Sequence, residues 1–171
     1  MDVYLMRHGE AMSREAAGAS TDAERRLSVG GVAAVSLIGR RLRARNVRPD
    51  RILCSPISRA VQTAELIAKA LDGPSLDRIE RVGSLHPEQE AEAFVELVKR
   101  SRMTDRTLLA VGHQPLISAI ATSLIFGSAR DGLVVEPGTV LWIRLREFPR
   151  SMDAVLAGLW DPTVWLGERK A

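Results

Sequence analysis

The 171-residue sequence has one cysteine, few aromatic residues and no long uninterrupted apolar run. The single cysteine, Cys54, excludes a disulfide framework within the chain and a cysteine-based metal cluster. Its place in an apolar, strand-like run indicates a small core residue rather than a nucleophile. Aromatic side chains make up 4% of the residues, too few for a surface on which nucleic-acid bases stack, so we expect no nucleic-acid partner.

Charge and length narrow the class of protein further. The net charge is +3, from 24 basic and 21 acidic residues. The basic residues form no tail and no long Lys/Arg block. No segment is apolar and long enough to span a membrane, and the first residues do not resemble a secretion signal, so we expect a cytoplasmic protein without a membrane partner. The length and a hydrophobic content of 46%, without repeats or linkers, predict a single domain over residues 1–171.

Short apolar runs that alternate with segments of helical periodicity predict an α/β fold. We expect strands at residues 1–7, 51–54, 76–82 and 107–111, helices at 28–46, 55–71, 87–100 and 115–127, and a loop or broken helix at 11–26. The helix after the second strand should begin with Ser55 as its N-cap and Pro56 in its first turn, and should stop at Gly73-Pro74.

The last third of the chain changes character. Strand-like runs at 132–136, 139–145 and 154–160 are separated by turn residues at 137–138 and at Pro149. Such a succession favours antiparallel strands. The predicted fold is therefore a three-layer α/β structure, with a mostly parallel central sheet flanked by helices and antiparallel strands toward the C-terminus.

Polar groups that suit a phosphoryl group follow three of the predicted strands. They are Arg7 and His8 at the end of the first strand, Ser55 and Arg59 after the second, and His113 after the strand at 107–111. An arginine binds two phosphoryl oxygens at once, and a histidine can attack phosphorus. Each residue alone would be an ordinary surface charge or core histidine, but the carboxyl ends of parallel strands share one edge of the sheet, so these groups can converge.

Three stretches of the chain resemble the motifs of the histidine phosphatase superfamily, which has the phosphoglycerate mutase-like fold. They are Leu5-Met6-Arg7-His8-Gly9-Glu10, Ser55-Pro56-Ile57-Ser58-Arg59-Ala60-Val61-Gln62-Thr63-Ala64 and Val111-Gly112-His113. The compact length and the stretch His113-Gln114-Pro115-Leu116 look most like the SixA-type protein phosphohistidine phosphatases.

This resemblance implies an activity and a role for each residue. His8 would be the nucleophile that forms a phosphohistidine intermediate, while Arg7, Arg59 and His113 would bind the phosphoryl oxygens. Further substrate contacts would come from Gly9, Ser55, Ser84 and His86. No metal ion or organic cofactor would be needed, and a phosphate or sulfate anion should fit the site.

One part of the family pattern is unclear. Relatives that cleave phosphate esters carry an acidic residue after the third strand as general acid. Here that position falls on Gly83 or Ser84, with Glu80, His86 and Glu88 as possible substitutes. An imidazole, with a pKa near ~6.5, leaves more easily than an alkoxide, so the lack of an acid should impair ester cleavage more.

The prediction is therefore a phosphatase that hydrolyses phosphohistidine on a phosphotransfer or signalling protein. Two alternatives remain open: a small-molecule phosphomonoesterase of the same superfamily, and a phosphate-binding interaction module with little turnover. Two smaller questions also remain. His86 lies either at the surface or against the substrate, and Glu10 either pairs with an arginine or is exposed. The three tryptophans, Trp142, Trp160 and Trp165, should pack within the last strands.

Overall fold

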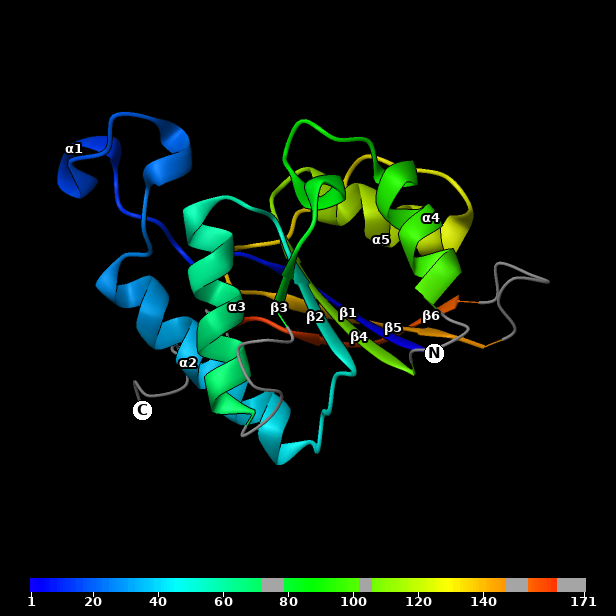
Figure 1. Cartoon of the computed structure of the whole chain (residues 1–171). Helices are drawn as coiled ribbons and strands as arrows, with labels where there is room; N and C mark the ends of the chain where they lie inside the picture. The colour runs from blue at the N-terminus through cyan, green and yellow to red at the C-terminus, as the bar shows by residue number, and fades with distance from the viewer. Residues whose placement is uncertain (72–78, 102–105, 147–153, 163–171) are drawn as a thin grey trace.

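A six-stranded mixed sheet forms the centre of the computed structural model, which describes residues 1–71, 79–101, 106–146 and 154–162 (Figure 1). The strands are β1 (Asp2–Arg7), β2 (Arg51–Cys54), β3 (Ile79–Arg81), β4 (Thr107–Gly112), β5 (Val140–Leu145) and β6 (Ala154–Trp160), in the order β3-β2-β4-β1-β5-β6. Neighbours among β1 to β4 pair in parallel, whereas β5 is antiparallel to β1 and β6 to β5. The predicted mostly parallel sheet with an antiparallel end is confirmed.

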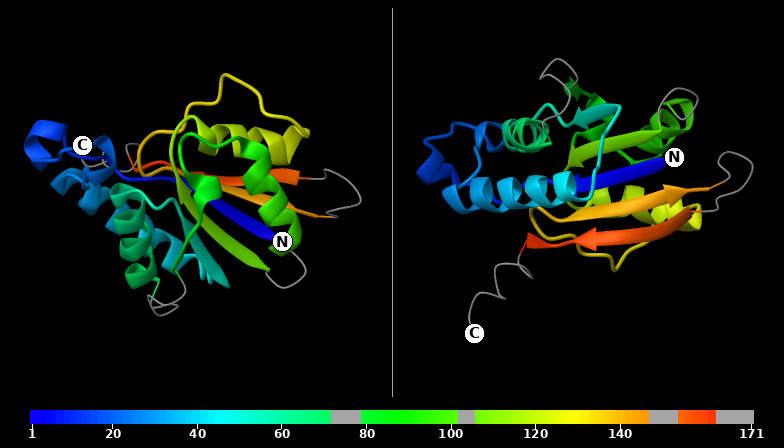
Figure 2. Two further views of the ribbon diagram at one scale, coloured as in Figure 1. Left: turned by 45° about the horizontal axis from the view of Figure 1, so that its top comes forward. Right: turned by 90° about the horizontal axis from the view of Figure 1, so that it is seen from below.

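Helices cover both faces of this sheet (Figure 2). The helices are α1 (Arg14–Ala17), α2 (Val29–Ala44), α3 (Ser58–Ala70), α4 (Ala91–Ser101) and α5 (Leu116–Phe126), with short 3-10 turns η1 (Asp22–Glu24) and η3 (Gly83–Leu85). Alternation along β1 divides the core: Val3 and Leu5 pack with α4 and α5, whereas Tyr4 and Met6 pack with α2 and α3. None of the described helices is long and apolar enough to cross a bilayer.

Several local predictions are confirmed. Ser28 caps α2, since its Oγ accepts a hydrogen bond from the Gly31 amide at 2.9 Å, and Asn46 takes the left-handed conformation just after that helix. The segment 11–26 is a broken helix made of α1 and η1. Trp142 and Trp160 pack within the last strands, where each stacks on Tyr4.

Other predictions are wrong at their boundaries. The helix expected from Ser55 begins at Ser58 instead, because the Ser55 amide still pairs with the Val111 carbonyl at the end of the sheet. The helix expected from residue 87 begins at Ala91, after the η3 turn. No strand forms at 132–136, a described stretch that runs as a loop into β5. The expected features at 73–74, 76–78, 149 and 165 lie outside the described residues.

Candidate active site

Arg7, His8, Arg59 and His113 line one hollow of about 350 Å³, although they come from three distant parts of the chain. The predicted convergence at the carboxyl end of the parallel strands is therefore present. Six further residues complete the lining: Glu10, Ala11, Arg25, Pro87, Gln114 and Pro137. Three arginines and two histidines face this hollow, and such a set favours an anion over a neutral ligand.

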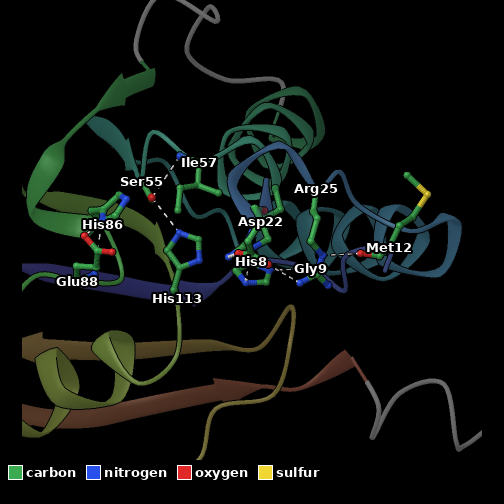
Figure 3. A network of polar contacts seen from close by, with 11 residues as sticks. His8, Gly9, Met12, Asp22, Arg25, Ser55, Ile57, His86, Glu88 and His113 are labelled. Atoms are coloured by element: carbon green, nitrogen blue, oxygen red, sulfur yellow. Dashed lines mark hydrogen bonds and ion pairs between the residues drawn. The ribbon is translucent and has the colours of Figure 1, made fainter. Parts of the chain in front are cut away.

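The hydrogen bonds of His8 fix which ring nitrogen carries its proton. Its Nδ1 lies 2.7 Å from the Gly9 carbonyl oxygen (Figure 3), and a carbonyl can only accept, so Nδ1 carries the hydrogen. At the other nitrogen, the Nε of Arg59 donates to Nε2 at 3.1 Å. Burial, together with the charges of Arg59, Arg7 and Arg25, lowers the pKa of His8 to about 4. His8 is therefore neutral at physiological pH, with its lone pair on Nε2.

Arg59 is buried in the first turn of α3, where three contacts hold its guanidinium. Besides the bond to His8, its Nη1 donates to the backbone carbonyl of Asp22 at 2.8 Å, and its Nη2 lies 3.0 Å from the Asp22 carboxylate. These contacts use Nη1 and Nη2, which form the outer edge of the guanidinium. Each of these nitrogens carries two hydrogens, so each has one hydrogen beyond the contacts named here.

The second family-like motif also supplies the residues that join α3 to the loop after β1. The Thr63 hydroxyl donates to the Arg59 carbonyl at 2.7 Å and accepts from the Gly9 amide at 3.1 Å. One residue earlier on this helix, the side-chain oxygen of Gln62 accepts from the Leu27 amide at 2.9 Å. This stretch therefore positions the arginine and also fastens the loop that carries His8.

His113 faces His8 across the hollow. The two ring centroids are 4.9 Å apart, with the planes tilted by 58°. The Nε2 of His113 contacts the Ser55 hydroxyl at 2.9 Å, and Figure 3 shows its other nitrogen on the side of His8. Burial, followed by the influence of His8 and Arg59, lowers the pKa of His113 to about 3. A serine hydroxyl can donate or accept, and in the tautomer in which Ser55 donates to Nε2 the proton of this neutral ring lies on Nδ1.

Two buried nitrogen atoms of the lining residues have no hydrogen-bond partner within the described part of the chain. They are Nδ1 of His113 and Nε of Arg7, whose Nη1 donates to the Val135 carbonyl at 2.8 Å. A buried polar atom without a partner costs free energy, so such atoms tend to mark a site that a ligand completes. A tetrahedral oxyanion would supply acceptors to both.

Gly9 must be a glycine because its backbone packs tightly against α2. A Cβ atom at this position would lie 2.6 Å from Cγ2 of Val35 and 3.2 Å from the Gly31 carbonyl oxygen. The Gly9 amide is bonded to Thr63 and its carbonyl to His8. The structure thus places Gly9 behind His8, as the residue whose carbonyl orients the imidazole ring.

The remaining predicted contact residues lie at different distances from the hollow. Ser55 touches His113, as described above. Ser84 is half-buried in η3, and its buried hydroxyl has no partner among the described residues; it does not line the hollow. His86 lies next to the lining residue Pro87, and its Nδ1 accepts from the Glu88 amide at 3.5 Å.

The carboxylates considered as general acids do not gather at the hollow. Both oxygens of Glu80 bind Arg51, at 2.8 and 2.7 Å, out on β3. Glu88 is exposed, and Glu10 is the acidic side chain that lines the hollow within the described structure. Glu10 is exposed, and its Oε2 accepts a hydrogen bond from the Ser28 hydroxyl at 2.8 Å. The described residues include no group of three His, Cys, Asp or Glu side chains placed to hold a metal ion.

Sequence reasoning missed two charged residues at this site. Arg25 lines the hollow, with its Nε donating to the Met12 carbonyl at 2.7 Å and its Nη1 to the Asp22 carboxylate at 2.8 Å. Asp22 contacts Arg59 as well. The segment 11–26 was expected to flank the site, and its density of charged residues was the available signal. Without periodicity in this segment, the particular residues could not be chosen.

Comparisons with known proteins found a matching family model and related sequences. Residues 3–83 match the family model described as histidine phosphatase superfamily (branch 1). An uncharacterized protein from Picosynechococcus is 32% identical over 145 residues, which cover 84% of this chain and 85% of that protein. The phosphohistidine phosphatase SixA of Escherichia coli is 29% identical over 130 residues, or 74% of this chain and 76% of that one.

A solved structure is similar over nearly the whole length. The protein histidine phosphatase SixA complexed with tungstate superimposes with a TM-score of 0.84, covering 96% of this chain and 99% of that chain at 23% identity. At this identity the likeness shows a shared fold.

Proposed function

This chain belongs to the histidine phosphatase superfamily, and from that premise we propose that it hydrolyses phosphohistidine on a phosphotransfer or signalling protein. The family and its SixA relatives support a phosphatase in general terms. The finer assignment, to phosphohistidine carried by a protein, rests on the chemistry of the hollow. A cytoplasmic location stays a prediction of the sequence.

One observation carries the proposal: the proton on Nδ1 of His8 is held by the Gly9 carbonyl, so the lone pair on Nε2 faces Arg59 and the hollow. A nucleophile must be deprotonated and aimed at the reacting atom. The lowered pKa of His8, caused first by burial, meets the first requirement, and the two hydrogen bonds meet the second.

The reaction would proceed in two displacements. In the first, Nε2 of His8 bonds to phosphorus while the phosphorus–nitrogen bond of the substrate breaks. The substrate ring, protonated from water on its other nitrogen, leaves with that electron pair as a neutral imidazole. The Nδ1–H of His8 stays on the Gly9 carbonyl, so the phosphorylated ring carries a positive charge. In the second, water attacks phosphorus, the bond to Nε2 breaks, and the water proton leaves with the phosphate.

The surrounding cations would stabilise both transition states. Arg7 and Arg59 would each donate to the non-bridging oxygens, where negative charge is spread as the phosphoryl group moves. The Nδ1–H of His113, opposite His8, would donate to the same group. The positive charge on the phosphorylated His8 ring also makes it a good leaving group for the second step.

Trapping the intermediate tests the nucleophile. We expect label from a radioactive phosphohistidine protein to appear on the wild-type chain as an acid-labile adduct, and to be absent from His8→Ala. His86→Ala, which removes a histidine outside the hollow, is the matched control and should still be labelled. Turnover by wild type without any adduct on residue 8 would contradict the two-step reaction, and phosphate binding without turnover would favour a binding module.

A small-molecule phosphomonoesterase is the second candidate, and Glu10 is the observation that favours it. This carboxyl lines the hollow and, if protonated, could donate to an alkoxide leaving group. Phosphohistidine cleavage needs no such donor, so Glu10→Gln should change it by less than about threefold. Faster cleavage of small phosphate esters than of a phosphohistidine protein at equal concentration, lost in Glu10→Gln, would establish the second candidate instead.

A further inference from the structure

We propose that Asp22 is a positioning residue that holds the Arg59 guanidinium at the angle needed for phosphoryl transfer, a role that rests on the proposed function. Asp22 lies in η1, outside the motifs shared with the family. Its Oδ2 lies 3.0 Å from Nη2 of Arg59, and its backbone carbonyl accepts from Nη1 at 2.8 Å. Figure 3 shows Asp22 beside His8 and Arg25.

One carboxylate serves two arginines at this point. Oδ2 of Asp22 binds Arg59, and Oδ1 accepts from Nη1 of Arg25 at 2.8 Å. Both arginines line the same hollow, where two like charges repel each other. The bridging carboxylate offsets this repulsion and sets the distance between them. Its hydrogen bonds to Arg25 and Arg59 hold the pKa of Asp22 below its usual range, so it acts as an anion and not as a proton donor.

The exposure of the two partners separates positioning from stabilisation. The Arg59 side chain is 9% exposed, whereas that of Asp22 is 57% exposed. Ion pairs with an exposed partner add little to stability. The backbone carbonyl of residue 22 also survives any side-chain change, so Arg59 keeps one anchor. Loss of the carboxylate should therefore leave the fold intact and release one edge of the guanidinium.

The outer edge, Nη1 and Nη2, matters because the third nitrogen of the guanidinium, Nε, covers the proposed nucleophile, Nε2 of His8. In this structure the Nε–H of Arg59 is bonded to the lone pair of His8 Nε2, which must become free before attack. A phosphoryl oxygen can draw this hydrogen away by a small tilt, provided the outer edge stays fixed on Asp22. Without the carboxylate, Arg59 can follow the phosphate in the ground state and lose its alignment in the transition state.

This argument predicts opposite changes in binding and in rate. Removing a negative charge beside the hollow should tighten inorganic phosphate about threefold to tenfold. Loss of alignment should lower kcat about tenfold, a combination expected when an interaction favours the transition state over the bound ground state. A merely structural role would lower the active fraction and leave the affinity of the remaining sites unchanged.

The test uses Asp22→Asn and Asp22→Ala, with Glu15→Gln as matched control because Glu15 is an exposed carboxylate of the same segment, in α1. We would measure kcat on a phosphohistidine protein, calorimetric affinity for inorganic phosphate, and thermal midpoint. We expect lower kcat, tighter phosphate and a midpoint within a few degrees for both variants, unchanged values for Glu15→Gln, and partial recovery of kcat in Asp22→Glu.

Other outcomes would overturn the proposal. Values of kcat within twofold of wild type would leave Asp22 a purely electrostatic neighbour. Unchanged phosphate affinity with a lowered midpoint and a lowered active fraction would make it structural. Wild type that turns over no phosphorylated substrate would refute the proposed function separately. In that case the phosphate titration still tests the first step of the argument, because weaker or unchanged binding in Asp22→Asn means that the carboxylate does not act on an anion in the hollow and overturns the proposal.

Discussion

His8 and His113 are held as neutral imidazoles inside a ring of positive charge, and this has a consequence for stability. Their pKa values, lowered mainly by burial to about 4 and about 3, lie below the ~6.5 expected in an unfolded chain. As the pH falls from about 6.5 towards 4, the unfolded chain takes up protons that the folded chain excludes. The stability linked to these neutral imidazoles is therefore complete above about pH 6.5. It is lost as the pH falls towards the folded pKa values, about 4 for His8 and about 3 for His113.

We expect the free energy of unfolding to fall between pH 6.5 and 4, by roughly 1.4 kcal/mol per pH unit for each buried histidine. Urea titrations of wild type and His113→Asn across this range would measure it. The variant should lose stability less steeply than wild type as the pH falls. Equal slopes for wild type and His113→Asn would show that His113 accepts a proton in the folded state.

Arg7 and Arg59 offer the sharpest test of the phosphoryl clamp. Changing either to alanine should lower kcat by roughly 10² to 10³, as for other deletions of a donor to transition-state charge. Arg59→Lys should recover little, because one compact ammonium group cannot replace the planar guanidinium that bonds His8, the backbone carbonyl of Asp22 and its carboxylate together. Steady-state kinetics would measure this, with Arg40→Ala on the exposed face of α2 as control. A loss below tenfold at both positions would contradict the clamp.

The predicted residues converge, but their individual contacts could not be read from the sequence. Arg7, His8, Arg59 and His113 follow strands or enter a helix, so topology alone brings them to one edge of the sheet. The hydrogen bonds that orient them could not be assigned in advance, even where the residue that makes the bond lies within a motif, as Thr63 does. Thr63 holds Gly9, and Asp22 lies in a charged segment without periodicity.

At the scale of elements, the join between α3 and the loop after β1 depends on one hydroxyl. Thr63→Val removes the acceptor of the buried Gly9 amide without changing the shape of the side chain. An unsatisfied buried amide costs about 1–3 kcal/mol, which chemical denaturation would detect. We also expect a lower kcat, because Gly9 orients His8. Thr63→Ser retains the hydroxyl and should behave nearly as wild type; similar losses in both variants would mean that the methyl group, and not the bond, is what matters.

Tertiary contacts explain where the expected elements were misplaced. Ser55 and Pro56 form a good helix start, but the Ser55 hydroxyl is bound to His113 and its amide to the sheet, so α3 begins three residues later. Residues 132–136 are apolar enough for a strand, yet the Val135 carbonyl accepts from Arg7. In both cases the site takes backbone or side-chain groups that local propensity would have given to secondary structure.

For the whole molecule, β4 is the strand on which cooperativity should depend. It pairs with both β1 and β2, and its alternate residues pack into both halves of the core. Leu109→Ala, at a fully buried position, should cost about 2–5 kcal/mol. Tryptophan fluorescence follows the packing of β5 and β6, which carry Trp142 and Trp160, and phosphate binding follows the integrity of the hollow. The two probes should lose their signals at one urea concentration, in wild type and variant alike; separate midpoints would contradict the predicted single domain.

The order of strands in the sheet also bears on how the protein is made. β1 leaves the ribosome first, yet its two neighbours, β4 and β5, begin at residues 107 and 140. The amide of Arg7 bonds to Thr139 and that of His8 to Gly112, so these bonds form only when most of the chain has been synthesised. His8 therefore emerges long before the strands that position it, and the hollow forms only after residue 139 has been added to the nascent chain.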